Sequence, residues 1–403
     1  MKKNHTSTAW LTWGIMLVGA NLRLPITMIP PLLPTIKQTL GLPASMAGML
    51  TTIPLLMFAL ASPLIAKMGN RRGNEWSLLI ALVILLAGSL LRIIPSLTAL
   101  IAGTLLIGFG ISGGNVLLPA IIKDQFPHAI GAKTSLYTVT MGLIASLGTG
   151  LAGLLNQQFN MQITLAAFSL VGVFGLLVWA LAFRTLPKKA ARQGVQRKNI
   201  AVSRSMLAWW IALFFGLQSF LYYSLLTWLP SLWQATGFSQ IAGFSQIAAG
   251  NLATIFQLSG MPATLSIPFI AEKRHGLLYS VWGIMLGFVL GALGILIPGA
   301  NFGLNVVYAL LMGVASGAAF AICIVFFQKK TADAYETASL SGFAQSVGYL
   351  FAAVGPVLYG FIQTATGSWD LLLWLTVGLT LLMFVAGLII NANHRIFPSK
   401  ANR

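Results

Sequence analysis

The chain has 403 residues, of which 57% are hydrophobic and 7% are charged. A soluble domain carries about 25% charged residues, so this composition excludes a soluble globular protein and indicates an integral membrane protein. The formal net charge of +18 would also suit a nucleic-acid binder. The basic residues lie in short loops between apolar runs rather than on one folded face, however, so we do not expect nucleic acid as a partner.

Apolar runs of about 20 residues predict membrane-spanning helices. In the first half of the chain such runs cover residues 10–36, 44–66, 76–94, 97–122, 134–155 and 163–183. In the second half they cover residues 206–233, 241–271, 277–297, 304–327, 338–362 and 371–390. We therefore expect an all-α integral membrane protein with twelve transmembrane helices in a lipid bilayer.

The first of these runs carries a single charged residue, Arg23, within the sequence Asn21-Leu22-Arg23-Leu24-Pro25. At about 1.5 Å per helical residue, Arg23 lies roughly 20 Å from the cytoplasmic end, near the middle of a bilayer about 30 Å thick. A lipid-facing arginine there costs at least ~2.5 kcal/mol, so we expect Arg23 to face a bundle interior or a water-filled cavity and to bind an anion or a carbonyl. The alternative is a structural clamp on backbone carbonyls beside Pro25.

Positive charge in the loops predicts the orientation of the helices. Counted with the amino terminus inside, the cytoplasmic loops receive nearly all lysines and arginines, whereas the opposite face receives only Lys37 and Arg92. This positive-inside pattern predicts a multi-pass protein with both termini in the cytoplasm. The basic stretch 184–205 is too charged to cross a membrane, so it predicts a cytoplasmic linker between two six-helix bundles at 1–183 and 206–403.

The two halves also repeat each other in sequence, which predicts pseudo-symmetric bundles with the same orientation. Residues 105–110 parallel residues 310–315, at the same distance from a basic loop. Leu33-Pro34 near the end of the first span parallels Leu229-Pro230 near the end of the seventh. This alignment places Ser219 opposite Arg23.

Six plus six parallel spans with a central cytoplasmic loop resemble the major facilitator superfamily. The loop at 69–73 resembles the signature of that superfamily between its second and third spans, with Asn70 where an acidic residue is usual. Three further stretches resemble its cyanate-permease and nitroimidazole-transporter branch: residues 21–23 with 31–34, residues 114–119 with 122–123, and residues 340–350. The resemblance implies a small, compact solute near the membrane midplane, two halves that rock around it, and the cytoplasmic membrane of a bacterium.

The polar residues that could complete a binding site with Arg23 are uncharged. By the predicted spans, the six acidic residues and four histidines lie in loops or at span ends, so a proton relay or a cationic substrate loses support. The candidate site residues beside Arg23 are Thr27, Asn115, Gln218, Tyr222, Tyr223, Gln345 and Tyr349. Each has a structural alternative, because polar side chains in membrane bundles also bind each other across helices and aromatic side chains also pack.

These residues favour a secondary active or facilitative transporter that moves a small anionic or polar nitrogen-containing, cyanate-like solute by alternating access. The alternative is an exporter of neutral heteroaromatic compounds such as 2-nitroimidazoles, in which Arg23 donates to a nitro or carbonyl oxygen. An enzyme would need an acid, a base or a metal in the spans, and a sensor would need an output domain. We therefore expect no enzyme activity and no cofactor. Cys323 is the only cysteine and no Cys/His group has the spacing of metal ligands, so we expect no metal site. We also expect a monomer.

Overall fold

The computed structural model describes residues 2–41, 49–185, 201–235, 244, 246–297, 299 and 301–397. Within these ranges every regular element is a helix, and eleven helices are long and apolar enough to cross a membrane. Most of the predicted linker, residues 186–200, lies outside the described residues.

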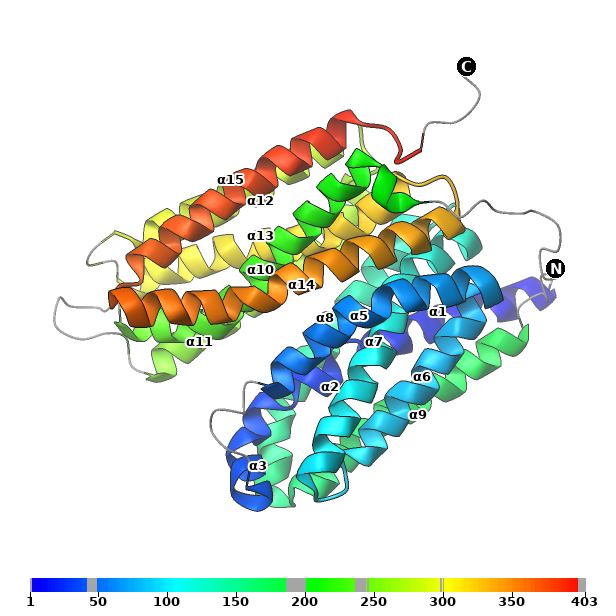
Figure 1. Ribbon diagram of the computed structural model, residues 1–403, viewed down its shortest axis with the longest axis horizontal. Coiled ribbons are helices and arrows are strands. Elements are labelled where there is room, and N and C mark those ends of the chain that lie inside the picture. The colour runs from blue at the N-terminus through cyan, green and yellow to red at the C-terminus, as the bar shows by residue number, and fades with distance from the viewer. Residues whose placement is uncertain are drawn as a thin grey trace. The chain divides into compact units, whose positions relative to one another are not determined.

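The helices of the first half of the chain begin with an interrupted segment and continue with long, single helices (Figure 1). The interrupted segment comprises α1 (Lys2–Asn21), α2 (Leu24–Thr27), the 3-10 helix η1 (Pro30–Leu32) and α3 (Leu33–Leu40). The long helices are α5 (Met49–Arg72), α6 (Asn74–Leu91), α7 (Leu97–Gln125), α8 (Ile130–Gln158) and α9 (Met161–Thr185).

The helices of the second half are all long. After the 3-10 helix η2 (Val202–Arg204) they are α10 (Met206–Ala235), α11 (Gln246–Ile270), α12 (Gly276–Ile295), α13 (Phe302–Lys329), α14 (Ala334–Thr366) and α15 (Asp370–Ala392). Eleven of the twelve predicted spans therefore correspond to one helix each in the described part of the chain, with ends that differ by a few residues. The first predicted span, 10–36, is instead interrupted.

Prolines explain the interruption of the first span. A proline lacks the backbone N–H of a helical hydrogen bond, and its ring clashes with the carbonyl four residues before it. Pro25 lies in the first turn of α2, where proline is tolerated, and Pro30 begins η1. The chain therefore reaches Leu40 in short pieces rather than in one helix.

The described helices form two compact units. The first unit comprises Met1–Val202 with Thr331–Ser346, and the second comprises Ser203–Lys330 with Val347–Arg403. In the first unit α6 lies beside α7 and α9, and in the second unit α12 lies beside α13 and α15 (Figure 1). The start of α14 thus belongs to the first unit, although the helix itself continues into the second.

Glycines allow the closest helix contacts inside each unit. In the first unit, a Cβ atom on Gly88 of α6 would lie 2.7 Å from the carbonyl oxygen of Gly103 of α7. In the second, a Cβ atom on Gly317 of α13 would lie 2.1 Å from the carbonyl oxygen of Gly260 of α11. Small residues of this kind let membrane helices approach backbone to backbone.

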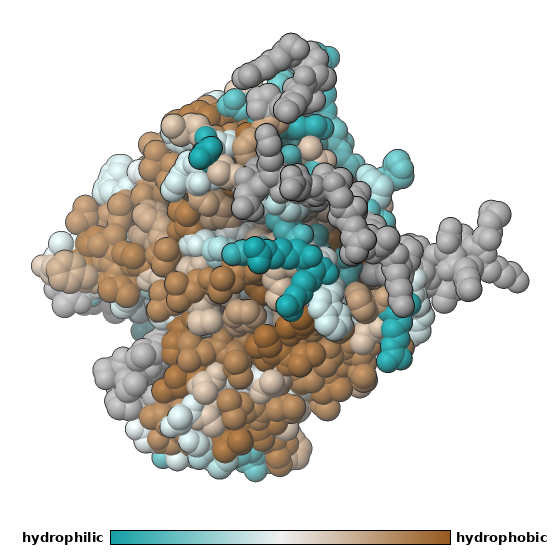
Figure 2. All heavy atoms as spheres, turned by 45° about the vertical axis from the view of Figure 1, so that its right-hand side comes forward, coloured by the Kyte–Doolittle hydropathy of each residue, from teal (hydrophilic) through white to brown (hydrophobic). Residues whose placement is uncertain are grey.

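Large apolar side chains cover much of the outer surface, as expected where lipid replaces water. Figure 2 shows brown, hydrophobic residues over most of the visible face. Leu60 and Leu64 on α5 and Phe361 on α14 are more than 60% exposed. A soluble protein rarely exposes such large contiguous apolar areas, so this surface suits a bilayer.

Candidate functional site

Arg23 lies at the break between α1 and α2. Helix α1 ends at Asn21, Leu22 and Arg23 form a turn, and Arg23 caps the amino terminus of α2. The Arg23 carbonyl accepts hydrogen bonds from the backbone nitrogens of Ile26 and Thr27, both at 3.0 Å. The side chain is half-buried. Irregular backbone at membrane depth is tolerated where it is buried in protein or lines a water-filled cavity, and broken helices often form ion and substrate sites.

The break leaves the backbone carbonyl of Pro25 without its usual helical donor. In a continuous helix the Pro25 carbonyl would accept from the nitrogen of Ile29, four residues later. In the structure, that nitrogen donates instead to the carbonyl of Ile26, at 3.2 Å. Pro25 is buried, so its carbonyl needs a donor from outside the segment.

Arg92 supplies that donor. It follows α6 directly and is only 1% exposed. Its Nη1 donates to the Pro25 carbonyl at 2.6 Å, while Nε and Nη2 donate to Oγ1 of Thr104 on α7 at 3.1 and 2.8 Å. The Thr104 hydroxyl in turn donates to the carbonyl of Leu100 at 2.6 Å. Arg92 thereby ties α2 to α6 and α7.

The structure adds to the sequence interpretation of Arg92. The loop count concerned only which face this residue belongs to, and the structure shows that its side chain is buried inside the first unit. Arg92 also performs the clamp on a carbonyl beside Pro25 that the sequence left open as an alternative for Arg23. The sequence carried only a weak signal that Arg92 is buried. Arg92 is a basic residue on the face with few cations, and Thr104 follows it twelve residues later inside the fourth span.

Neighbouring polar side chains hold the two pieces of the broken helix. Asn21 is buried, and its Nδ2 donates to the carbonyls of Leu17, at 2.8 Å, and Val171 of α9, at 3.0 Å. The hydroxyl of Thr27, a predicted site residue, donates to the carbonyl of Ala145 of α8 at 3.1 Å. Thr27 therefore makes a hydrogen bond between helices, which is the structural role that the sequence analysis gave as the alternative to solute binding.

Asn115 lies close to the break. All residues from 110 to 122 are described, and all are buried except Asn115, which is half-buried. A Cβ atom on the preceding residue, Gly114, would lie 2.3 Å from Cδ2 of Leu22, so α7 packs directly against the turn that carries Arg23. The backbone carbonyl of Asn115 accepts from Nε2 of Gln345 at 3.0 Å. The first unit thus brings the break, Asn115 and Gln345 together.

The start of α14 contacts the rest of the first unit at two further points. Nδ2 of Asn70 donates to Oγ of Ser339 at 2.7 Å. Nζ of Lys123, at the end of α7, donates to the carbonyl of Thr331 at 2.6 Å and to its hydroxyl at 2.8 Å. These contacts fix the position of the α14 segment on which Gln345 lies.

The other four predicted site residues belong to the second unit. Gln218 is buried on α10, and its Nε2 donates to Oγ of the adjacent Ser219 at 2.6 Å. Tyr222 and Tyr223 are half-buried and pack edge to face, with ring centroids 5.0 Å apart. Tyr349 is buried on α14 against Phe215, also edge to face at 5.0 Å. The role of these four residues in substrate binding stays a prediction.

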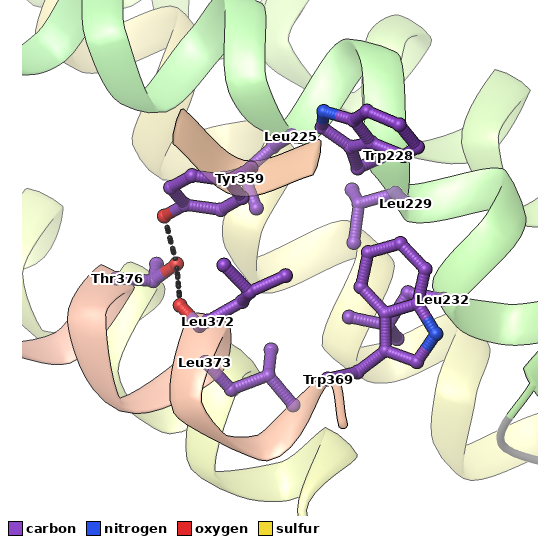
Figure 3. Close-up of a pocket in the computed structure, with 9 residues that line it drawn as sticks. All are labelled: Leu225, Trp228, Leu229, Leu232, Tyr359, Trp369, Leu372, Leu373 and Thr376. Atoms are coloured by element: carbon purple, nitrogen blue, oxygen red, sulfur yellow. Dashed lines mark hydrogen bonds between the residues drawn. The ribbon is translucent and has the colours of Figure 1, made fainter. Parts of the chain in front are cut away.

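The second unit also contains a small pocket whose described lining includes none of these four residues. Figure 3 shows it between α10, α14 and α15, lined by the indoles of Trp228 and Trp369 and by several leucines. The hydroxyls of Tyr359 and Thr376 are 2.7 Å apart at one side. The pocket has room for about one water molecule, so it is too small for a solute.

Comparison with known proteins identifies transporters along the whole chain. The 2-nitroimidazole transporter of Escherichia coli is 36% identical over 376 residues, which cover 93% of each chain. The cyanate transport protein CynX of Escherichia coli is 27% identical over 363 residues, which cover 88% of this chain and 90% of that protein. These relatives confirm the predicted branch.

Solved structures show the same fold. The Escherichia coli fucose:proton symporter FucP superposes with a TM-score of 0.75 at 13% sequence identity, covering 97% of this chain and 99% of that one. A family model described as Major Facilitator Superfamily matches residues 15–356. The predicted all-α transporter fold is therefore confirmed, and the chain belongs to the major facilitator superfamily.

Proposed function

We propose that this membrane transporter moves a small, planar, nitrogen-containing solute across the bacterial cytoplasmic membrane by alternating access, with Arg23 as the principal binding group. The observation that carries the proposal is the break in the first span. It places a guanidinium at the start of a short helix, in irregular backbone at membrane depth, where such backbone usually serves a cavity or a solute.

Arg92 supports the proposal, because it serves one carbonyl beside the break without Arg23. The carbonyl of Pro25 already receives a hydrogen bond from Arg92 at 2.6 Å, so the clamp beside that proline does not require Arg23. Arginine offers a planar fork of donors that matches carboxylate-like, nitro or carbonyl oxygens. A half-buried guanidinium with that geometry suits a solute with one strong acceptor end.

Two solute classes fit such a site. The first is a small anion such as cyanate, for which the positive charge of Arg23 supplies the attraction. The second is a neutral heteroaromatic compound such as a 2-nitroimidazole, whose nitro oxygens accept from the guanidinium fork. The similarity to the 2-nitroimidazole transporter, which extends over 93% of both chains, supports the second class as an alternative to the first.

A thermal-shift experiment on the full-length protein in detergent tests the role of Arg23. Wild type, Arg23→Ala and Lys37→Ala are compared with cyanate, nitrate, formate, bicarbonate and 2-nitroimidazole. A ligand that binds only the folded state stabilises it by about 2.7 kcal/mol at a hundred times Kd, so millimolar binders register. Lys37→Ala is the control, because it removes an exposed cation from α3 in the same unit.

We expect at least one ligand to raise the melting temperature of wild type and of Lys37→Ala, and to leave Arg23→Ala unchanged. Stabilisation by cyanate supports the anion carrier, whereas stabilisation by 2-nitroimidazole alone supports the heteroaromatic carrier. A ligand that stabilises all three proteins equally would show that Arg23 does not bind it, and would overturn the proposal.

A further inference from the structure

The side-chain amide of Gln345 has a fixed orientation. Its Nε2 donates to the backbone carbonyl of Asn115 at 3.0 Å and to Oγ of Ser341 at 2.7 Å. A backbone carbonyl can only accept hydrogen bonds, so the amide atom that faces Asn115 must be the nitrogen. The other corner of the amide is therefore the oxygen, Oε1, and flipping the group would place two acceptors against each other.

Oε1 of Gln345 is a buried acceptor without a donor. Gln345 is only 2% exposed, and its Oε1 is buried and has no hydrogen-bond partner. Native proteins rarely leave a buried polar atom unpaired, because its lost hydration is not compensated. Such an atom at a binding site is usually completed by water or by the ligand.

The position of this oxygen connects it with the break in the first span. Its amide is bonded to Asn115, the half-buried residue of an otherwise buried stretch of α7. The residue before Asn115, Gly114, is in contact with Leu22, the residue before Arg23. The helix whose carbonyl receives the Gln345 amide therefore packs, one residue earlier, against the turn that carries Arg23.

We infer that Oε1 of Gln345 accepts a hydrogen bond from the solute, and that the carrier therefore selects solutes with an N–H or O–H donor near the acceptor group that Arg23 binds. The inference rests on the proposed role of Arg23 and narrows its two solute classes. Cyanate and nitrate carry no hydrogen and would leave Oε1 unpaired. A planar azole with a free ring N–H and an acceptor substituent would satisfy both groups.

A site that binds a donor rejects analogues without it, because its own acceptor is then left buried and unpaired. One hydrogen bond of ordinary strength corresponds to about tenfold in affinity. The carrier should therefore bind 2-nitroimidazole about tenfold more tightly than 1-methyl-2-nitroimidazole. The two compounds share the nitro group and the ring, and the methyl group replaces the ring N–H.

The test measures Kd for this pair by thermal-shift titration of the full-length protein, at a mildly acidic pH at which the azole keeps its ring proton. Wild type is compared with Gln345→Leu, which removes the acceptor, and with Ser341→Ala, which removes a partner of Nε2 and leaves Oε1 in place. We expect the tenfold preference for the N–H compound in wild type and Ser341→Ala, and a ratio close to one in Gln345→Leu.

Several outcomes would overturn the inference. Equal binding of the two compounds by wild type would do so without any variant, even if Gln345→Leu fails to fold. A preference that survives in Gln345→Leu would show that the methyl group is excluded by its size. Cyanate bound more tightly than either azole, with binding lost in Arg23→Ala, would refute the inference while the proposed role of Arg23 stands.

Discussion

The first span of the first unit and the first span of the second unit occupy corresponding positions in the sequence repeat, but only the first of them is interrupted. The segment from Lys2 to Leu40 is broken into α1, α2, η1 and α3, whereas α10 continues from Met206 to Ala235. Aligned at Leu33-Pro34 and Leu229-Pro230, Pro25 and Pro30 correspond to Leu221 and Leu226. The proline they share does not break α10, so the additional prolines account for the difference.

The two units also differ at the positions of Arg92, which donates to the Pro25 carbonyl, and of its partner Thr104. Aligning Ile94-Pro95 with Ile297-Pro298 places Ile295 where the first unit has Arg92, and the repeat of the fourth span places Ala309 where it has Thr104. Ile295 and Ala309 are both buried. In the second unit the positions that correspond to Arg92 and Thr104 are apolar and supply no side-chain donor. The comparison indicates that the break and the buried arginine depend on each other, because the arginine donates to a carbonyl that the break leaves without a helical donor.

We expect the largest loss of stability when a proline is introduced into α10, at a position where no side chain is available to donate to the freed carbonyl. Leu226→Pro removes a backbone hydrogen bond inside α10, and we expect it to lower the free energy of unfolding by about 3 kcal/mol or more. Leu226→Ala is the control, because it shortens the same half-buried side chain and keeps the backbone bond. Thermal unfolding in detergent measures both. Equal melting temperatures would show that α10 tolerates the break without a donor.

We expect the second-largest loss of stability when Arg92, the donor to the Pro25 carbonyl in the first unit, is replaced. Arg92→Met leaves the Pro25 carbonyl buried without a partner, and we expect a loss of about 2 to 3 kcal/mol of unfolding free energy. Ile295→Met is the matched control at the corresponding position of the second unit, where a change between similar apolar volumes costs less than about 1.5 kcal/mol. If both variants melt together, the hydrogen bonds of Arg92 contribute nothing measurable.

A change of the guanidinium at the break tests function rather than folding. Arg23→Lys keeps the charge and loses the planar fork, so solute affinity should fall nearly as far as in Arg23→Ala, by about 2 kcal/mol or roughly thirtyfold. Ser219→Ala, at the corresponding position of α10, is the comparison and should change affinity less. Transport and Kd at the wild-type level in Arg23→Lys would contradict a role for the fork.

The smallest effect is expected at the second partner of Arg92. Thr104→Val removes a hydroxyl that accepts from Nε and Nη2, and it leaves the bond from Nη1 to Pro25 intact. We expect a loss of about 1 kcal/mol in unfolding free energy, measured by the same thermal unfolding. The double variant Arg92→Met with Thr104→Val should then cost little more than Arg92→Met alone, because the two residues act on one network. Fully additive losses would argue against that network.

Much of the fold follows from hydropathy alone. Apolar run length located eleven described helices to within a few residues, because a lipid environment requires each backbone polar group to be satisfied within its own helix. The same reasoning failed at the first span, where it predicted one helix and the structure has several pieces. Run length measures apolar character and does not register a proline that interrupts the hydrogen bonds.

The candidate site was accessible from sequence only in part. Arg23 could be identified because a charge inside an apolar run is conspicuous, and the structure places it with Asn115 and Gln345 in the first unit. Arg92 could not, because a loop count treats each cation as solvated and contains no information on a side chain that turns back into the bundle. Hydrogen-bond partners, such as those of Thr27 and Gln218, depend on helix rotation, which hydropathy leaves undetermined.

The hydrogen bond between Arg92 and the buried Pro25 carbonyl constrains how the sequence can evolve at these two positions. With Arg92 in place and the helix continuous, a guanidinium would be buried with no carbonyl to receive it; with the proline alone, the carbonyl would lack a donor. Either intermediate is impaired, so the two positions should be inherited and lost together. Descendants of the same duplication that regain a continuous first helix should also replace this arginine by an apolar residue, as the second unit does at Ile295.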